Sequence, residues 1–208
     1  YRGYGLELVP GTGLLAATVP AAFDAWLQAL QHFGTLSLED VLGPAVELAE
    51  RGVPMLPAIR QAIESVAPTY AADWPTSAKL YLPGGAPPPL GRPFRNVEMA
   101  ATYKRIIEEE RAARSRGRDA GIEAARRAFY EGFVAETIDR FCRENEVRDV
   151  TGARRRGLLT AQDMAKYRGR IERPVSVDYH GITVHKCGFW SQGPSFLEQL
   201  NVLKGFDL

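Results

Sequence analysis

The sequence predicts an α+β fold that is predominantly helical, with one β-hairpin near residues 174–186. Two observations predict it. Apolar residues recur at helical spacing through most of the chain before this segment, and glycines, prolines and capping residues separate the runs. The period then changes to two, since apolar and polar residues alternate within 175–179 and again within 182–184. His180-Gly181 between these stretches is typical of a two-residue hairpin turn.

Three helices are predicted in the first quarter of the chain. Apolar spacing predicts the first over residues 23–34, with Gly34 as its stop. Ser37 and Asp40 form a capping-box pattern at the start of the second. We expect that helix to be short, because Gly43-Pro44 interrupts it and proline suits the first turn of a fresh helix. Gly52 is the predicted stop of the fresh helix.

The next segment is rich in proline. Pro57 is predicted to begin a helix that ends before Pro68, because the residue preceding a proline disfavours helical backbone. Eight prolines lie between Pro57 and Pro93. Residues 68–96 are therefore predicted to be the longest irregular stretch, with an exposed turn and a short polyproline piece at 83–89.

Three helices are predicted in the middle of the chain. Asn96 is a candidate N-cap for the first, Gly132 separates the second from the third, and the charged run at 108–118 is typical of a solvated helix face. The apolar residues that define these helices are Met99, Tyr103, Ile106 and Ile107, then Ile122, Ala125 and Phe129, then Phe133, Ile138, Phe141 and Cys142.

The last third mixes loops with short elements. Residues 148–157 are polar and basic, which predicts a surface loop. Thr160 and Asp163 form a second capping-box pattern for a short helix through Tyr167. The hairpin follows, and a helix is predicted after a loop at 188–194.

Composition excludes several classes of protein. Of the 208 residues, 45% are hydrophobic and 25% are charged, which excludes a disordered or collagen-like chain. Lys and Arg total 26 against 25 Asp and Glu, so no excess of positive charge indicates a nucleic-acid partner. No apolar run approaches the roughly 20 residues that span a bilayer. The two cysteines exclude a disulfide-dense scaffold and leave the compartment open.

Two hydroxyl side chains are candidate nucleophiles. Ser191 lies between Gly188 and Gly193, a pattern similar to the Gly-x-Ser-x-Gly elbow of α/β-hydrolases, although the first glycine is one residue too far away. The alternative is a tight loop whose glycines allow close backbone packing. Thr183 is a candidate N-terminal nucleophile after self-cleavage, whereas strand alternation explains it equally well.

No metal site is predicted. His32, His180 and His185 have no helical ligand spacing such as His-x-x-x-His, and no Cys-x-x-Cys pair is present. Cys142 lies on an apolar helix stripe and is expected to be a buried, inert thiol, while Cys187 belongs to a different element.

Nucleotide binding is not supported either. Gly11-Thr12-Gly13 lacks the Gly-Lys-Ser/Thr that cradles phosphates. The Arg126-Arg127 and Arg154–Arg156 clusters are candidates for contact with an acidic partner. Nearby acidic residues favour the alternative, a solvated surface.

Several stretches of the sequence resemble those of a known family and occur in the same order. They are 13–20 with Phe23-Asp-Ala-Trp26, Phe33-Gly-Thr-Leu36, 44–52, Ala128-Phe-Tyr-Glu-Gly132 with Ile138, 157–163 with Tyr167-Arg168, Tyr179-His-Gly181, Gly193-Pro194 and 200–208. Together they cover nearly the whole chain. The ordered set resembles the large-subunit part of the γ-glutamyltranspeptidase family, which are N-terminal-nucleophile (Ntn) hydrolases of αββα fold.

The resemblance implies a proenzyme that cuts itself into a large and a small subunit. The new N-terminal Thr of the small subunit attacks a γ-glutamyl amide such as glutathione, and the acyl group passes to water or to an amino-acid or peptide acceptor. No metal or organic cofactor is implied. The family's Thr and oxyanion donors lie beyond the matching segment, and no motif supports a carboxylate-binding role for Arg2. The resemblance therefore assigns no catalytic residue to this chain, and it leaves the substrate-binding residues unknown.

The sequence is expected to be a single fragment of such a large subunit, because it begins at Tyr1 and residues 204–208 read like a helix end in mid-protein. Its expected parts are an extended segment at 1–22, a helical layer at 23–172, and a hairpin plus helix at 173–208. The expected partners are the remaining N-terminal part and the small subunit.

One loop departs from the family pattern. The stretch that reads Pro-Pro-Pro-Ser-Ser/Gln-Gly-Gly in the family is Gly-Phe-Trp-Ser-Gln-Gly-Pro here, at residues 188–194. This departure leaves open an acylase of the same superfamily that acts on other amides. A free-standing helical interaction module is the alternative that involves no enzyme.

Overall fold

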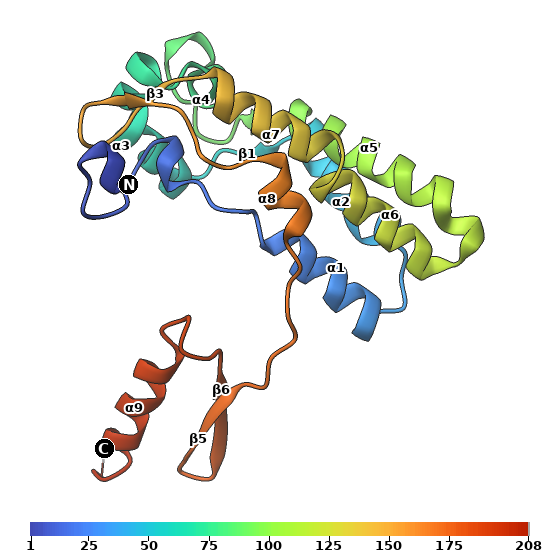
Figure 1. Ribbon diagram of the computed structural model, residues 1–208, viewed down its shortest axis with the longest axis vertical. Coiled ribbons are helices and arrows are strands. Elements are labelled where there is room, and N and C mark those ends of the chain that lie inside the picture. Colours follow the sequence, from blue (N-terminus) through green and yellow to red (C-terminus); the bar gives the residue numbers. More distant parts are fainter. Residues whose placement is uncertain (208) are drawn as a thin grey trace. The chain divides into compact units, whose positions relative to one another are not determined.

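The computed structural model describes residues 1–207, which form two compact units, Tyr1–Arg168 and Gly169–Leu208. The first unit is mostly helical, and the second is a hairpin followed by a helix (Figure 1). The strands of the described residues pair two by two and antiparallel: β1 with β2, β3 with β4, and β5 with β6. This arrangement confirms the predicted α+β, predominantly helical class.

The elements of the first unit, in chain order, are α1 (Ala22–Phe33), α2 (Leu38–Arg51), β1 (Val53–Pro54), α3 (Pro57–Asp73), α4 (Pro75–Tyr81), β2 (Pro93–Phe94), α5 (Val97–Ala113), α6 (Arg118–Tyr130), α7 (Phe133–Glu144), β3 (Val147–Arg148), β4 (Arg154–Arg155) and α8 (Ala161–Lys166). Short 3-10 turns lie at Arg2–Tyr4, Leu14–Ala16, Pro83–Gly85 and Arg114–Arg116. The second unit contains β5 (Val175–Tyr179), β6 (Ile182–Lys186) and α9 (Gly193–Leu203).

The main core lies where α1, α6, α7 and α8 meet, and α5 packs between α2 and α6. Its fully buried side chains include Leu27, Ile106, Ile122, Tyr130 and Met164. A separate core cluster, formed by Met55, Ile63 and Leu82, lies under the proline-rich segment. Apolar burial of this kind is the main favourable term in folding, so these contacts fix the helical layer.

The predicted helix caps at Ser37, Asn96 and Thr160 are confirmed. Ser37 Oγ accepts a hydrogen bond from Asp40 N at 3.2 Å, and Asp40 Oδ2 accepts one from Ser37 N at 3.0 Å. Thr160 and Asp163 repeat this reciprocal pair at the start of α8. The Asn96 side chain accepts from Met99 N at the start of α5. Each cap satisfies a backbone N–H that the helix itself leaves without a partner.

The prediction that Gly43-Pro44 interrupts the second helix is wrong, because α2 runs unbroken from Leu38 to Arg51. A proline within a helix removes one hydrogen bond and crowds the preceding turn. Leu38 before it and Val46 after it are both buried, against different parts of the core. The packing of these two side chains holds the helix together across Pro44.

The prediction of an irregular stretch from Pro68 is also wrong in its first part. Helix α3 continues through Pro68 to Asp73, and α4 follows directly. Tyr70 lies beyond the proline, packs on the Met55 core cluster and stacks on Tyr81 at 5.7 Å. Tertiary packing thus overrides the local signal. Residues 83–92 are irregular as predicted, apart from a 3-10 turn at Pro83–Gly85.

Two smaller differences concern side-chain exposure and a missed hairpin. Met99 is exposed on α5, whereas Ala100 is fully buried in its place. The predicted loop at 148–157 contains β4, which pairs with β3.

Gly13 brings the N-terminal segment close to this hairpin. Its φ is +87°, and a Cβ at this position would lie 2.7 Å from the Cβ of Asp149. Only glycine allows the two segments to approach so closely.

The second unit confirms the predicted hairpin. Val177 pairs with Val184 at its centre, and the turn has positive φ at both His180 (50°) and Gly181 (81°), which suits a type I′ turn. Helix α9 begins at Gly193. A Cβ at Gly193 would lie 2.0 Å from the carbonyl oxygen of Cys187, so only glycine fits where α9 meets β6. Within residues 1–207, no helix is long and apolar enough to cross a bilayer.

Candidate functional site

Ser191 is engaged in the turn that precedes α9. Its Oγ donates to the carbonyl oxygen of Gly188 at 2.9 Å and accepts from Gly193 N at 3.0 Å. A nucleophilic serine needs a base within hydrogen-bond reach of its hydroxyl. Here both contacts of the hydroxyl are to backbone groups, so the geometry favours the tight loop over the nucleophile elbow.

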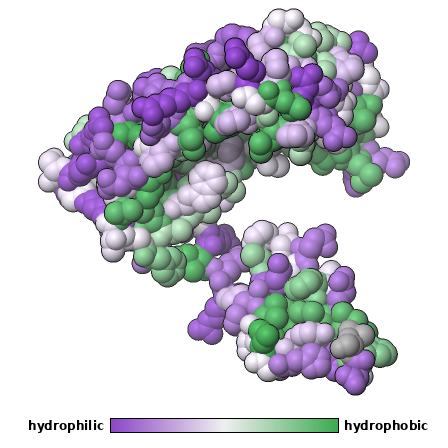
Figure 2. Space-filling model, turned by 180° about the vertical axis from the view of Figure 1, so that it is seen from behind, coloured by the Kyte–Doolittle hydropathy of each residue, from purple (hydrophilic) through white to green (hydrophobic). Residues whose placement is uncertain are grey.

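The same loop presents two aromatic rings to solvent. Phe189 is 90% exposed and Trp190 is 73% exposed, and Trp190 Nε1 donates to Glu172 Oε2 at 2.8 Å. On the flanking elements, β6 and α9, Lys186 Nζ lies 5.4 Å from the ring centroid of Phe196. Figure 2 shows apolar surface on the second compact unit, which contains this loop. Exposed large aromatic rings on a fixed loop are typical of a contact surface.

The structure does not gather the remaining sequence candidates into one site. Thr183 lies in the middle of β6, paired with Asp178, and His185 pairs with Ser176. Burial raises the pKa of the Cys142 thiol, which favours the unreactive protonated form, and Cys187 is exposed. Among residues 1–207, no three His, Cys, Asp or Glu side chains come together as metal ligands.

Arg126 was predicted to lie on a solvated surface or to contact an acidic partner, and both predictions are wrong. Its side chain is 3% exposed. Its Nε donates to Asp24 Oδ1 at 2.8 Å, and its Nη2 donates to the carbonyl oxygen of Tyr167 at 2.5 Å. Arg127, the next residue, is exposed. The apolar spacing of this helix offers a signal that separates the two, because Arg126 lies four residues after Ile122 and three before Phe129, on the apolar face.

Tyr130 completes this buried group. Its hydroxyl donates to the carbonyl oxygen of Pro20 at 2.6 Å and accepts from Asp24 N at 3.0 Å. Burial raises the pKa of Tyr130 to about 12. The phenol therefore stays protonated and acts as a fixed donor that ties the start of α1 to the end of α6.

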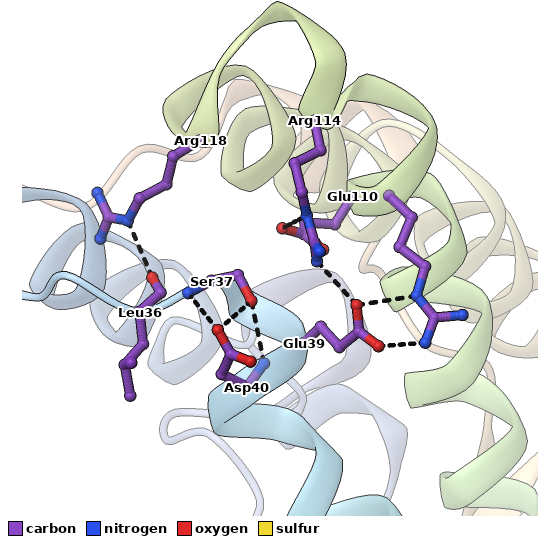
Figure 3. Close-up of polar contacts among 8 residues, drawn as sticks. Leu36, Ser37, Glu39, Asp40, Glu110, Arg114 and Arg118 are labelled. Carbon is purple, nitrogen blue, oxygen red and sulfur yellow. Dashed lines mark hydrogen bonds and ion pairs between the residues drawn. The ribbon is translucent and has the colours of Figure 1, made fainter.

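A charged network joins α2 to α5 on the outside of the helical layer (Figure 3). Glu39 on α2 accepts hydrogen bonds from Arg111 and from Arg114, and Arg114 also donates to the buried Glu110. The hydrogen bonds from Arg111 and Arg114 lower the pKa of Glu39 to about 2. Nearby, Arg118 donates to the carbonyl oxygen of Leu36. The charged groups of the network pair with one another, which indicates a structural role.

The Arg154–Arg156 cluster is also paired within the protein. Arg154 donates to Asp73, Arg155 pairs with the buried Asp149, and Arg156 lies 3.5 Å from Glu146. The Arg154–Asp73 pair joins the β3–β4 hairpin to the end of α3, and the other two pairs lie within the hairpin region. In the part of the chain that the structure describes, each of these three arginines therefore has a carboxylate partner.

Beside this hairpin lies a cavity of about 310 Å³, here called the Trp74 cavity. Its lining comes from segments far apart in the chain: Gly13, Leu14, 73–77, Phe141, 145–147 and Arg154. No pattern in the sequence indicates this cavity, since these segments meet only through the fold. A concave, largely apolar site with a few polar groups is the usual form of a small-molecule pocket.

Comparison with known proteins places the chain in a family. The family model of gamma-glutamyltranspeptidase matches residues 3–208, so the chain belongs to the γ-glutamyltranspeptidase family. Its relatives include proteins named as acylase and glutathione hydrolase-like proenzymes. The resemblance inferred from the sequence is thereby confirmed.

Three proteins that are similar to this chain illustrate the names and the degree of identity found among its relatives. The chain is 32% identical over 197 residues to the Acylase ACY 1 proenzyme of Pseudomonas sp. (strain SE83), covering 94% of this chain and 31% of that protein. It is 31% identical over 205 residues to the Glutathione hydrolase-like YwrD proenzyme of Bacillus subtilis (strain 168), covering 98% and 34%. The solved structure of LmbA2991HD is 46% identical, with a TM-score of 0.91, covering 98% and 34%. The chain thus spans about a third of the length of these relatives.

Proposed function

We propose that this chain is a large-subunit piece of an Ntn-type enzyme that transfers or hydrolyses γ-glutamyl groups. The observation that carries the proposal is the family match over residues 3–208. The partners would be the remaining N-terminal part and the small subunit of the same proenzyme, and the donor would be a γ-glutamyl compound such as glutathione. No metal or organic cofactor is needed.

In this proposal the nucleophile is an N-terminal Thr of the small subunit, outside residues 1–208. The free amine of such a Thr acts as the base for its own hydroxyl, so no separate His is required. The internal bonding of Ser191 and the mid-strand place of Thr183 support a nucleophile elsewhere. In this proposal the helices of the first unit have a structural role, and the small subunit supplies the reacting groups.

The test is release of p-nitroaniline from γ-glutamyl-p-nitroanilide. We expect the self-cleaved full-length protein to release it and the isolated chain of residues 1–208 to release none. Turnover by the isolated chain would show that the nucleophile lies within it. A full-length protein that cleaves itself but leaves the γ-glutamyl substrate intact would contradict the transpeptidase reaction.

A second candidate is an acylase that acts on other amides. Two observations favour it: the loop at residues 188–194 carries the exposed rings of Phe189 and Trp190, and one relative of 32% identity is an acylase proenzyme. Exposed rings suit contact with an apolar acyl group better than with a charged γ-glutamyl group. Comparing kcat/KM for γ-glutamyl amides with kcat/KM for amides of apolar acids decides between the two, and a clear preference for γ-glutamyl donors excludes the acylase.

A further inference from the structure

The Trp74 cavity is bounded by apolar side chains on most of its wall. Leu14 comes from the N-terminal segment, Trp74 and Pro75 from the junction of α3 and α4, Phe141 from α7 and Val147 from β3. Its volume of about 310 Å³ lies at the low end of the range for small-molecule sites. A compound with one aromatic ring matches that size better than a larger ligand does.

The frame of the cavity is fixed by hydrogen bonds between distant elements. Asp73 Oδ1 accepts from Arg148 Nε at 3.1 Å and from Arg154 Nη1 at 3.2 Å. Trp74 Nε1 donates to the carbonyl oxygen of Arg148 at 3.3 Å. These bonds join the end of α3 to both strands of the β3–β4 hairpin. The walls are therefore held in place before any ligand arrives, which reduces the entropy cost of binding.

The charges in the lining are already paired by the protein. Asp73 is held by the two arginines, Arg154 also donates to the carbonyl oxygen of Glu146 at 2.8 Å, and the Glu146 carboxylate lies 3.5 Å from Arg156. A charged ligand would lose part of its hydration and would have to compete with these existing pairs for a counter-charge, which is unfavourable. The lining thus disfavours amines and carboxylates.

Two hydroxyl groups remain for a ligand. Thr76 and Ser77 line the cavity, and within residues 1–207 neither hydroxyl has a hydrogen-bond partner in the protein. A hydroxyl can both donate and accept, so this pair suits an uncharged polar group. We propose that the Trp74 cavity is a binding site for a small, uncharged aromatic compound that bears a hydroxyl or amide group. This site goes beyond the amide chemistry proposed above and does not depend on it.

The test measures binding of 2-phenylethanol to the full-length protein by ligand-observed NMR and calorimetry, with 2-phenylethylamine and phenylacetate as charged analogues of similar size. We expect 2-phenylethanol to bind, and both charged analogues to bind at least about tenfold more weakly because their charge must be desolvated. Equal or tighter binding of a charged analogue would overturn the assignment. Absence of binding, including absence because another part of the protein fills the cavity, would also overturn it.

Variants place the binding in this cavity. Removing both hydroxyls, with Thr76→Val and Ser77→Ala together, is expected to weaken binding about tenfold, the loss of two modest hydrogen bonds. Val147→Phe narrows the cavity and is expected to abolish binding. The matched control combines Thr102→Val and Ser65→Ala, whose hydroxyls donate to Glu98 and Ala62 on other surfaces. Binding that survives Val147→Phe in a protein that melts like the wild type would show that the compound binds elsewhere. Cleavage of γ-glutamyl-p-nitroanilide is measured in a separate assay. Loss of the binding proposal can therefore be distinguished from loss of the proposed function.

Discussion

Arg126 and Asp24 form a buried ion pair between helices α6 and α1, with Arg126 Nε 2.8 Å from Asp24 Oδ1. Their side chains are 3% and 0% exposed. The pair is not isolated, because Arg126 also bonds the carbonyl oxygen of Tyr167 and Gln28 donates to Asp24 Oδ2. The pair and its hydrogen bonds link α1, α6 and the end of α8 at one point in the core.

Replacing Arg126 with Met should destabilise the protein strongly. Arg126→Met removes the positive charge that pairs with the buried Asp24 carboxylate, and breaking a buried ion pair in this way typically costs about 3–5 kcal/mol. Chemical denaturation with circular dichroism measures the free energy of unfolding. The matched control is Arg127→Met on the same helix, since Arg127 is exposed and its loss should change stability by less than about 0.5 kcal/mol. Equal losses in the two variants would contradict the structural role of the pair.

The Tyr130 hydroxyl provides a second test. In Tyr130→Phe, Asp24 N and the carbonyl oxygen of Pro20 lose their shared partner, so we expect a loss of about 1–3 kcal/mol. Tyr103→Phe is the control, because Tyr103 packs on the same core and its hydroxyl forms no hydrogen bond within residues 1–207.

The raised pKa of Tyr130 also predicts a pH dependence. In the folded protein the pKa is about 12, against a value of 10.0 without the fold. The unfolded chain therefore releases this proton first as pH rises. The contribution of Tyr130 should be complete below pH 10.0 and should be lost between pH 10.0 and about 12. Phenolate absorbance, compared with that of Tyr130→Phe, follows the titration, and ionisation of Tyr130 near pH 10.0 would contradict the prediction.

Glu39 predicts a pH dependence at the acidic end. Hydrogen bonds from Arg111 and Arg114 lower its pKa from 4.5 to about 2. A carboxyl group whose pKa is lower in the folded protein stabilises the fold above its unfolded pKa, and that contribution is lost as pH falls. We expect Glu39→Gln to remove an acid-sensitive contribution between pH 4.5 and about 2, measured as the shift in melting temperature across that range. Glu108→Gln, at an exposed residue of α5, is the control and should leave the melting temperature in this pH range unchanged.

Ser191→Ala tests the turn against the nucleophile. If Ser191 only closes the turn before α9, the full-length variant should keep its rate of amide cleavage within about threefold. Its melting temperature should fall modestly, because the bonds to Gly188 and Gly193 are lost and such bonds contribute about 1 kcal/mol each. A loss of activity of a thousandfold or more in a folded protein would instead identify Ser191 as a reacting group.

The sequence predicted those features that depend on neighbours in the chain. The capping boxes at Ser37 and Thr160 and the His180-Gly181 turn are local patterns, and the structure confirms each. The errors at Pro44 and Pro68 have the opposite origin, because core contacts on both sides of each proline outweigh its local cost. The Trp74 cavity and the burial of Arg126 depend on segments that meet only after folding. The cavity has no signature in the order of the residues, whereas the spacing of Arg126 from Ile122 and Phe129 places it on the apolar face of its helix.

The exposed rings of Phe189 and Trp190 give a last prediction, which concerns specificity. If they contact the acyl group of the substrate, the double variant Phe189→Ala and Trp190→Ala should lower kcat/KM for amides of apolar acids about tenfold, and it should leave kcat/KM for γ-glutamyl-p-nitroanilide nearly unchanged. Stability should change little, because the Ser191 bonds that fix the loop remain and the one bond lost, from Trp190 to Glu172, is exposed. Phe206→Ala in the same unit, at a ring that is 59% exposed, is the control for loss of an exposed aromatic residue. A parallel loss of activity on both substrate classes would show that the rings support the active site as a whole and do not select the acyl group.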